Sequence, residues 1–442
     1  MAEILKIFEN SLKKSKAEQT ELVCEKEEFY LSRFSENKIN ANVGRNDRTI
    51  WCRAIVGKKI GIAKTNILAQ EAVDDLVNRA LEICSQQNDD PQFSGLVYSP
   101  PTNHPGGYFE STAKFSAMAK AQAIKSIVDI AQSHNLETSG MFQNSATELT
   151  VANSLGTVQQ GKVTEARLSV TLSGDNDDRA GSAQACARDV SQFDYKAIAQ
   201  FAAEKASRST SPIELTPGQY TVILEPEAVA DFLLFLGFLG FGGKGMVSGR
   251  GFMADKIGQQ IMSSSVTITE DPFNPVMAYM PFDYEGLPRQ TTPLVENGMA
   301  MGAVYDSYYA ALKSTQSTGN ALPPDNKFGP YPKTMVMNPG QKLLAEIIAS
   351  SDNAIFINHF WYLNYVNPMK TMVTATTRDG TFMIENGQVG APVKDIRIMQ
   401  SMLESFNNIE TVSSDRRLVY KFGVLMYVPA LKINNFNFVP SE

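Results

Sequence analysis

The alternation of apolar and polar residues changes period several times in the first half of the chain. Residues 1–20 and 69–87 place apolar side chains at helical spacing. Residues 27–66 instead alternate apolar and polar side chains, with Asn-Lys, Gly-Arg-Asn and Gly-Lys turn signals between the runs. Such alternation is typical of half-buried strands. The pattern therefore predicts a four-stranded meander flanked by helices.

The pattern of apolar and polar residues predicts further helices and strands up to the middle of the chain. Residues 111–135 predict one long helix or two short ones, with Ser111 as the N-cap. Three further strands and a closing helix follow, at residues 138–156, 163–174, 182–193 and 195–209. This order of helices and strands predicts an α+β domain built on an antiparallel sheet.

Residues 207–219 are rich in Ser, Thr and Pro and give the best candidate for a domain boundary. We therefore expect an N-terminal α+β domain at residues 1–210 and a second domain at residues 211–442. The second domain reads mostly as strands. It contains Asn297-Gly298 and Asn386-Gly387 between apolar runs, which is the strongest short-range hairpin signal. A β-rich, barrel-like or sandwich-like domain is expected, with short helices at 252–262 and 396–410.

Composition excludes several functional classes. The net charge of -7 argues against a direct nucleic-acid binder, which would need a basic face. The four cysteines form no CxxC pair, so a disulfide framework and a zinc ribbon are not expected. Free thiols, together with an N-terminus unlike a signal peptide, favour a cytoplasmic protein. The apolar run 232–243 is shorter than the roughly 20 residues that a membrane span needs, and Asp231 and Lys244 bracket it.

Residues 221–240, TVILEPEAVADFLLFLGFLG, contain the most informative carboxylates. A strand over 221–224 leads to a helix that begins at Pro226, where the missing N–H costs nothing. Glu227 complements the positive end of the helix dipole. Asp231 lies on a helix that is apolar all round, so it must find a partner or a water-filled cleft. The helix could be a working site, a site that has lost its chemistry, or a capped core helix.

Residues 240–251, GFGGKGMVSGRG, could cradle an anion with backbone N–H groups, aided by Lys244 and Arg250. The stretch does not match the P-loop pattern. A flexible or closely packed loop, or the lid of a cleft, explains the glycines equally well.

Two other polar segments are candidates for a binding cleft. The loop 312–324 contains Ser317, Thr318 and Asn320, and long polar loops on a rigid scaffold often bind ligands. Arg378 and Asp379 precede a glycine, so they could line a cleft or form a tight turn with a local ion pair. The three histidines, His104, His134 and His359, form no HExxH or His-x-His motif.

Several segments, in this order and spacing, resemble the TldD/PmbA family, also called the modulator-of-gyrase family. These segments are GKKIGIAKTN, EAVDDLVNRALEI, VANSLG, VILEPEAVADFL, PFDYEGLPRQTTPLVENGMAMGAVYDSYYA, STGNA and TRDGTFMIENGQVGAPVKDIR. The resemblance runs along nearly the whole chain. It implies an α+β N-terminal domain and a β-rich C-terminal domain, in agreement with the pattern of apolar residues.

The family has two kinds of member. TldD-type members are metallopeptidases with an HExxxH helix and a cysteine ligand downstream, whereas TldE (PmbA) members lack these ligands. In this sequence Pro226 and Asp231 stand at the two histidine positions, Glu227 keeps the glutamate, and no cysteine follows Cys186. A catalytic zinc normally needs three protein ligands. We therefore expect no cofactor in this chain, and expect zinc in a TldD-type partner.

The resemblance thus implies a TldE/PmbA-like, non-catalytic subunit of a TldD/TldE-type metallopeptidase that acts on unfolded or extended peptides. Two alternatives remain open. The chain could be an active metal-dependent hydrolase with a divergent site formed by Glu227, Asp231 and His359. It could also be a homodimeric peptide-binding protein without a protease partner. The acidic composition gives no support to a direct link with gyrase.

Overall fold

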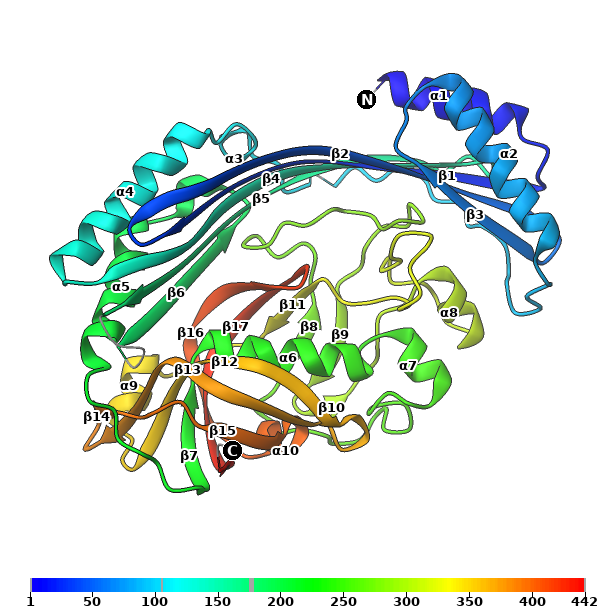
Figure 1. Ribbon diagram of the computed structural model, residues 1–442. Helices are drawn as coiled ribbons and strands as arrows, with labels where there is room; N and C mark the ends of the chain where they lie inside the picture. The colour runs from blue at the N-terminus through cyan, green and yellow to red at the C-terminus, as the bar shows by residue number, and fades with distance from the viewer. Residues whose placement is uncertain (1, 105, 175–178, 441–442) are drawn as a thin grey trace.

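A six-stranded antiparallel sheet arches over the second half of the chain in this computed structural model, which describes residues 2–104, 106–174 and 179–440 (Figure 1). The strand order is β3-β2-β1-β4-β5-β6. The strands are β1 (Gln19–Ser35), β2 (Lys38–Val56), β3 (Lys59–Thr65), β4 (Glu137–Asn153), β5 (Val158–Ser173) and β6 (Ala180–Ala187). The antiparallel sheet predicted for the first half is confirmed.

The predicted four-stranded meander is wrong in one respect, because β2 is continuous through the Gly-Arg-Asn signal. Gly44 and Arg45 pair with Tyr30 and Phe29 of β1 in an unbroken register. A two-residue hairpin turn needs positive φ, and Gly44 and Arg45 are not among the residues with positive φ. The meander therefore has three long strands.

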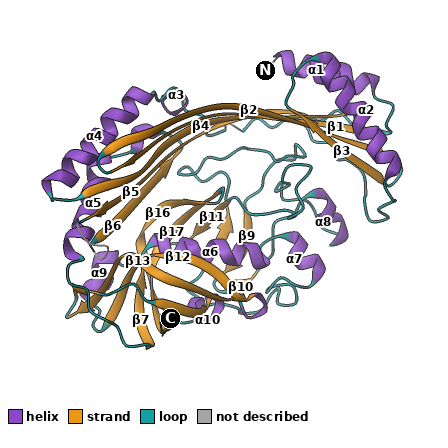
Figure 2. Ribbon diagram, in the orientation of Figure 1, coloured by secondary structure: helices purple, strands orange, loops and turns teal. Residues whose placement is uncertain are grey.

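Helices cover the two ends of the outer face of this sheet (Figure 2). They are α1 (Ala2–Lys14) and α2 (Gln70–Gln86) at one end, and α3 (Glu110–Ala113), α4 (Ala117–Ser133) and α5 (Tyr195–Arg208) at the other. Ser111 is not the N-cap, because Ser116 accepts the hydrogen bond from Ala119 N at the start of α4. Packing is close enough that a Cβ on Gly181 of β6 would lie 2.3 Å from Ala202 O of α5.

The two faces of β5 have different environments, as the period-two pattern requires. Ala166, Leu168 and Val170 are buried in the core formed with α4 and α5. Glu165 and Arg167, which alternate with these residues, face the second half of the chain and line a cavity there. The inner face of the arch is therefore partly polar.

The second half is organised around an eleven-stranded mixed sheet. Five of its strands close into a ring, in which β7 pairs with β12, β12 with β13, β13 with β15, β15 with β17, and β17 again with β7. The ring strands are β7 (Gly218–Leu224), β12 (Ala354–Asn367), β13 (Met372–Glu385), β15 (Arg397–Ser401) and β17 (Val424–Val439). The barrel-like architecture expected for this half is confirmed.

The other strands extend this ring. They are β8 (Ile268–Glu270), β9 (Thr292–Glu296), β10 (Met299–Ala300), β11 (Thr334–Met337), β14 (Gln388–Pro392) and β16 (Ile409–Lys421). Both predicted Asn-Gly hairpins are confirmed, joining β9 to β10 and β13 to β14. Asn297 and Gly298 have φ angles of 49° and 78°, and Asn386 and Gly387 have 50° and 74°.

Five helices and a 3-10 turn are described in the second half. They are α6 (Pro226–Gly240), α7 (Gly243–Ser248), α8 (Ser307–Leu312), α9 (Leu344–Ala349) and α10 (Met402–Asn407), with the 3-10 turn at Pro368–Lys370; another 3-10 turn, Val190–Gln192, precedes α5 in the first half. The helix expected at 252–262 is wrong, since these residues form turns and Gly258 has a φ of +78°. Residues 396–410 form β15 and then α10 rather than one helix.

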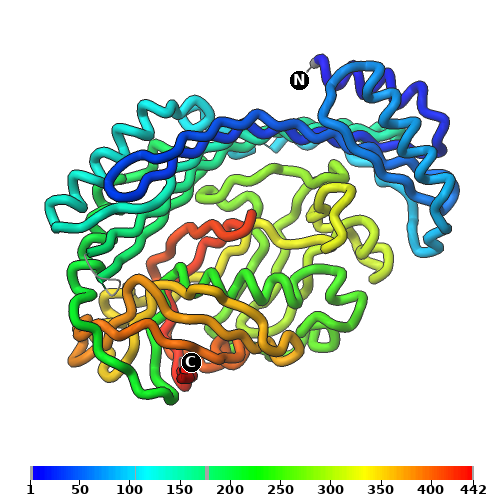
Figure 3. The backbone as a smooth tube through the Cα atoms, in the orientation of Figure 1, coloured from blue at the N-terminus to red at the C-terminus, as the bar shows by residue number. Residues whose placement is uncertain are grey.

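The chain passes from the first half to the second between α5 and β7 (Figure 3). α5 ends at Arg208 and β7 begins at Gly218, so no helix or strand occupies 209–217. Ile213 forms an isolated bridge with Val393. The boundary at residues 210 and 211 stays a prediction.

Candidate functional site

Helix α6 carries the carboxylates singled out from the sequence, and it lies at the centre of the second half. Twelve of its residues are buried. It packs against β12 and β17, where Phe232 stacks on Phe360 and Phe436 with ring centroids 5.2 and 6.0 Å away. None of the helices among the described residues is long and apolar enough to cross a membrane.

The first turn of α6 is formed as the sequence predicted. Pro226 occupies the first helical position, and Glu225 is the N-cap residue with extended backbone angles. Glu225 N donates to Ile357 O across 2.9 Å, which joins the start of the helix to β12. The helix therefore begins where β7 ends and its parallel pairing with β12 stops, at Leu224 and Ile357.

Glu225 is buried and paired with two cations. Its Oε2 lies 2.7 Å from Lys205 Nζ, and its Oε1 lies 3.1 Å from Arg417 Nη2. Lys205 also donates to Asn358 Oδ1 across 2.6 Å. Burial alone would raise the pKa of Glu225, but Lys205 and Arg417 outweigh it and hold the pKa below its usual value. Glu225 therefore anchors helix α5 and strand β16 to the start of α6.

Glu227 differs from Glu225 in its hydrogen bonding. Its side chain is buried, and its Oε2 atom has no hydrogen-bond partner among the residues that the structure describes. Burial raises the pKa of Glu227, while Lys421 and Arg417 oppose this shift. It borders a small cavity of about 50 Å³ whose walls include Cys186, Leu418 and Tyr420.

Asp231, which is buried on an apolar helix, forms an ion pair with Lys421. Lys421 Nζ lies 2.5 Å from Asp231 Oδ1, and Phe360 N donates to Oδ2 across 3.4 Å. Both charged side chains are mostly buried. The ammonium of Lys421 thus neutralises Asp231 without a metal ion.

His359 lies on β12, next to the strand residue that binds Asp231. Its Nε2 is 3.1 Å from Asp379 Oδ2, and its Nδ1 is 3.2 Å from Phe360 O. Both ring nitrogens are therefore engaged by acceptors within the chain. Arg378 pairs with Asp379 at 3.9 Å and lies over the ring of Trp361 at 5.0 Å. The tight turn expected here is wrong, because Arg378 and Asp379 lie within β13, where its register with β12 shifts and Asp379 has a φ of +54°. The expected local ion pair is present.

These donors do not fit a zinc ion of the kind that the HExxxH resemblance would imply. Pro226 has no ligand atom, Asp231 is bound to Lys421, and His359 is bound to Asp379. Within the described ranges, no group of three or more His, Cys, Asp or Glu side chains is arranged to hold a metal. We therefore derive no metal-dependent step for this chain.

The glycine-rich segment is more ordered than a loop. Gly243–Ser248 forms α7, and Gly249 ends it in the left-handed conformation. Lys244 donates to Lys327 O across 2.5 Å, and Arg250 is exposed. A helix of this length offers little anion binding by itself. The structure does not bring Lys244 and Arg250 to the carboxylates of α6 in any contact among the described residues.

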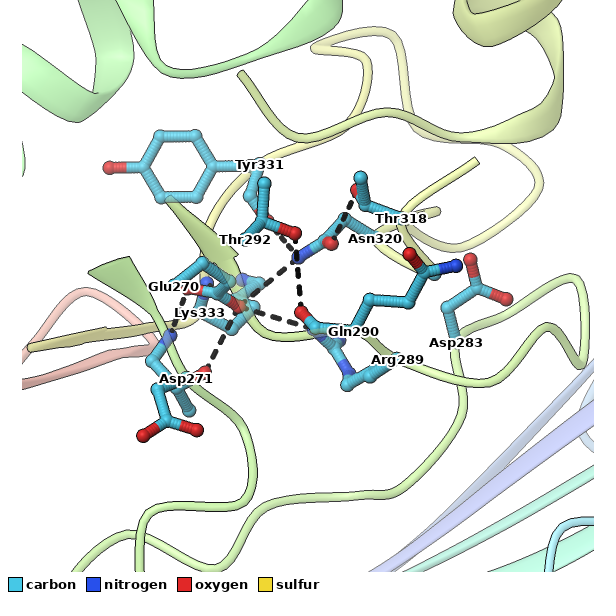
Figure 4. A network of polar contacts seen from close by, with 12 residues as sticks. Glu270, Asp271, Asp283, Arg289, Gln290, Thr292, Thr318, Asn320, Tyr331 and Lys333 are labelled. Atoms are coloured by element: carbon cyan, nitrogen blue, oxygen red, sulfur yellow. Dashed lines mark hydrogen bonds and ion pairs between the residues drawn. The ribbon is translucent and has the colours of Figure 1, made fainter. Parts of the chain in front are cut away.

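The polar loop residues form hydrogen bonds within the chain (Figure 4). Asn320 is buried, donates to Glu270 Oε1 across 3.1 Å and accepts from Thr318 Oγ1 across 2.9 Å. Ser317 Oγ donates to Tyr305 O across 3.0 Å. Glu270 is fully buried and also accepts from Thr334 N across 2.8 Å. These contacts fix the loop on the sheet.

The cations of the site were missed in the sequence. Lys205, Arg417 and Lys421 come from α5 and from β16, about 20 and 190 residues away from the carboxylates that they bind. The sequence feature that could have pointed to two of them is the strand-like run DRRLVYK, which contains three cations. The run gives no indication of which carboxylates these cations bind.

Two family models match this chain. The PmbA/TldA metallopeptidase C-terminal domain matches residues 217–439, and the PmbA/TldA metallopeptidase domain 1 matches residues 20–84. The chain belongs to the PmbA/TldD family. The matched C-terminal region of this family contains α6, the closed ring and all the residues that bind Glu225 and Asp231 except Lys205.

Relatives with known names are similar over part of their length. A metalloprotease of Methanothermobacter thermautotrophicus is 26% identical over 231 residues, which is 51% of this chain and 49% of that protein. The metalloprotease TldD homolog of Buchnera aphidicola from Schizaphis graminum is 26% identical over 233 residues, 52% and 46% of the two chains. The chain thus spans about half the length of the curated relatives it matches.

Solved structures share the fold along the whole chain. TldE from Thermococcus kodakarensis superposes with a TM-score of 0.86 at 22% identity, covering 98% of this chain and 100% of that one. A candidate modulator of DNA gyrase from Thermotoga maritima superposes with a TM-score of 0.87 at 17% identity, covering 99% of both chains. At these identities the likeness establishes the fold.

Proposed function

We propose that this chain is a TldE/PmbA-like, non-catalytic subunit of a metallopeptidase complex that acts on unfolded or extended peptides. In this proposal a TldD-type subunit supplies zinc and the catalytic groups. This chain completes the chamber and helps to hold the peptide.

The pairing of Asp231 with Lys421 is the observation that carries the proposal. A zinc peptidase helix needs ligands one turn apart, and here the first position is Pro226 and the second is held by an ammonium 2.5 Å away. Glu227 remains, but the glutamate of a zinc peptidase helix takes its proton from a metal-bound water, and the two ligand positions of this helix cannot bind the metal. The helix is thus preserved as a folded element whose charges are balanced by protein cations.

The surface that we assign to the partner lies beside this helix. Exposed aromatic and aliphatic side chains gather on β12, on the turn that follows it and on the end of α6. They are Phe238, Trp361, Tyr362, Val366 and Met369. Phe235 of α6 packs on Tyr365 of β12 with ring centroids 4.9 Å apart, so these elements form one continuous surface. Exposed apolar groups in this number favour a protein interface, and we assign it to a TldD-type chain.

The test begins with this chain purified alone, without an affinity tag or chelator. We expect elemental mass spectrometry to find far less than one zinc per chain, and we expect no hydrolysis of an unfolded protein such as reduced casein. After mixing with a TldD-type chain of the same organism, light scattering should give the mass of a complex that contains both, with one zinc per TldD-type chain and peptidase activity.

The two alternatives give different results in the same experiment. One zinc per chain in the purified protein, lost in His359→Ala, would establish the divergent hydrolase instead. A stable homodimer that binds peptide and ignores every TldD-type chain would establish the self-contained binding protein. A Trp361→Ser/Tyr362→Ser variant should fold normally and lose the complex if the assigned surface is correct.

A further inference from the structure

A cavity of about 400 Å³ lies between the inner face of the arched sheet and the second half of the chain. Its roof comes from β1, β4 and β5, where alternate residues such as Glu25, Leu149 and Glu165 face inwards. Its floor comes from residues 279–289 and 322–333 and from the β16–β17 hairpin, which rises towards the sheet in Figure 1. The volume is in the range of pockets that bind small ligands or short segments of chain.

Two arginines on this cavity are almost fully buried and have N–H groups left over. Arg188 donates from Nε to Met277 O across 2.6 Å and from Nη1 to Thr164 O across 3.1 Å, but its Nη2 has no hydrogen-bond partner among the described residues. In the same part of the chain, Arg289 Nε and Nη1 form no hydrogen bond, although Nη1 is 3.5 Å from Glu270 Oε1. Unpaired buried donors of this kind are costly, so they mark a place where an acceptor belongs.

The ring of Tyr279 contacts both guanidinium groups. Their central carbons lie 4.9 Å (Arg188) and 5.0 Å (Arg289) from the centroid of the Tyr279 ring. A planar guanidinium held against an aromatic ring keeps its edge available for a carboxylate. The ring therefore helps to hold two forked donors that both line the cavity.

A third cation, Lys333, has no hydrogen bond from its ammonium to any described residue. Burial lowers the pKa of Lys333 to about 8, and the neighbouring Arg289 adds to this shift. The carboxylates of the cavity balance these cations only in part. Glu165 is paired with Arg167 at 2.9 Å and lies 3.6 Å from Arg188 Nη1, and Glu25 accepts a hydrogen bond from the Tyr284 hydroxyl.

The tip of the β16–β17 hairpin holds an aromatic side chain in solvent. Phe422 and Gly423 form the two-residue turn with φ angles of 48° and 81°. Positive φ is unfavourable for a bulky residue, and Asn is usual at this position. Phe422 is nevertheless 82% exposed, next in the chain to Gly423, which lines the cavity. Backbone strain that supports no packing within the chain points to a role in binding.

We propose that this cavity binds a carboxylate of an extended peptide, with Arg188, Arg289 and Lys333 holding the carboxylate and Phe422 covering an adjacent apolar side chain. The carboxylate is the C-terminus of the peptide or an acidic side chain, since both offer the same pair of acceptor oxygens. The inference rests on the proposed function in one respect, namely that the ligand is an extended peptide.

A tryptophan close to the cavity allows binding to be followed by fluorescence. It has two tryptophans, and Trp51 lies with its ring centroid 6.3 Å from that of Tyr284, which lines the cavity. In a Trp361→Phe background, Trp51 is the remaining tryptophan. Its fluorescence can be titrated on this chain alone with an acetylated tetrapeptide that has an apolar third residue and a free C-terminus, with its C-terminal amide, and with an amidated peptide that contains an internal Glu.

We expect the free carboxylate and the internal Glu peptide to bind and the neutral amide to bind at least tenfold more weakly. Arg289→Gln and Lys333→Met should each weaken binding of the carboxylate peptides by about tenfold to a hundredfold. Phe422→Asn suits the turn better, so it should raise the thermal midpoint and still weaken binding. Arg79→Gln, which removes an exposed arginine from α2, is the matched control and should bind normally.

The different peptides and variants distinguish the ways in which the proposal can fail. Equal binding of carboxylate and amide peptides, or unaltered binding in Arg289→Gln, Lys333→Met and Phe422→Asn, would overturn the proposal. Competition by inorganic phosphate as strong as that by the peptides would overturn the assignment to a peptide. Because no partner is needed, the result is independent of whether a TldD-type chain forms a complex, so the two proposals can fail separately.

Discussion

The ammonium of Lys421 on strand β16 lies 2.5 Å from a carboxylate oxygen of Asp231 on helix α6. Across the first turns of that helix, Glu225, Glu227 and Asp231 face three cations, Lys205, Arg417 and Lys421, which other elements supply. The charges at the start of the helix are therefore balanced by long-range ion pairs, and the fold depends on them.

Lys421→Met should destabilise the protein by about 3 kcal/mol, because it leaves Asp231 as a buried charge without its partner. The double variant Asp231→Asn/Lys421→Met should recover most of this loss, since neither charge remains. Urea unfolding followed by circular dichroism gives both values. Equal losses in the single and the double variant would show that the pair has little coupling energy.

Glu227→Gln tests whether the preserved glutamate takes part in chemistry. In a complex with a TldD-type chain, we expect peptide hydrolysis to stay within about twofold of the unaltered complex. A general base would contribute about a hundredfold or more to the rate. The measurement is kcat/KM on a fluorogenic peptide, with Glu137→Gln, an exposed carboxylate on β4, as the control. A hundredfold loss of kcat/KM would show that Glu227 takes part in catalysis.

Asn320→Ala should cost about 2 to 3 kcal/mol of the free energy of unfolding. The reason is that the Asn320 amide binds the fully buried Glu270, and a buried charged acceptor that loses a donor is expensive. Ser317→Ala, in the same loop but half-buried, should cost about 1 kcal/mol or less. If instead Asn320→Ala unfolds like the parent protein and loses only peptide affinity, the loop binds ligand directly.

A group of buried carboxylates joins the two halves of the chain and should make stability depend on pH. Arg53 of β2 lies 2.7 Å from Glu21 of β1 and 3.5 Å from Glu285 of the second half. Burial raises the pKa of Glu21 to about 7 and that of Asp306 to about 7, with Glu285 adding to both shifts. These carboxyls therefore stay protonated in the folded protein at a pH where the unfolded chain has released the protons.

The sign of this effect follows from proton binding. Between about pH 4 and pH 7 the folded state binds more protons than the unfolded state at Glu21, so stability falls as the pH rises, by up to about 1.4 kcal/mol per pH unit for each such carboxyl. Glu21→Gln should flatten the fall measured by urea unfolding between pH 5 and pH 7.5, whereas Glu137→Gln should leave it unchanged. A parallel curve for Glu21→Gln would contradict the prediction.

Much of the fold followed from local pattern. The long amphipathic strands and helices of the first half and the two Asn-Gly hairpins have periods and turn residues that leave few alternatives. The errors occurred where pairing overrides local signals: Gly44 and Arg45 continue β2 because β1 pairs with them throughout, and residues 252–262 have a helical pattern but form turns held by contacts with other segments. Closure of the ring could not be predicted from local sequence patterns, because it requires β7 to pair with β17, which is far from it in the sequence.

Of the site, only helix α6 and its carboxylates could be predicted from the sequence. Pro226, Glu227 and Asp231 were found because the helix start and its apolar faces are contiguous in the sequence. The charges that complete it are on α5 and β16, and no local rule pairs Lys421 with Asp231 across 190 residues. The cavity arginines Arg188 and Arg289 were missed for the same reason, since each is a lone cation in its own segment.

The closed ring also determines when the second half can form during synthesis. Its first strand, β7, pairs with β17, which ends at Val439, so the ring cannot close before β17 has left the ribosome. Until then the apolar helix α6 has no complete wall to pack against. Long-range strand pairing is slow and leaves apolar surface open. The nascent chain therefore passes through an interval, after the strands of the arched sheet have been synthesised, in which the apolar side chains of α6 lack their final contacts with β12 and β17.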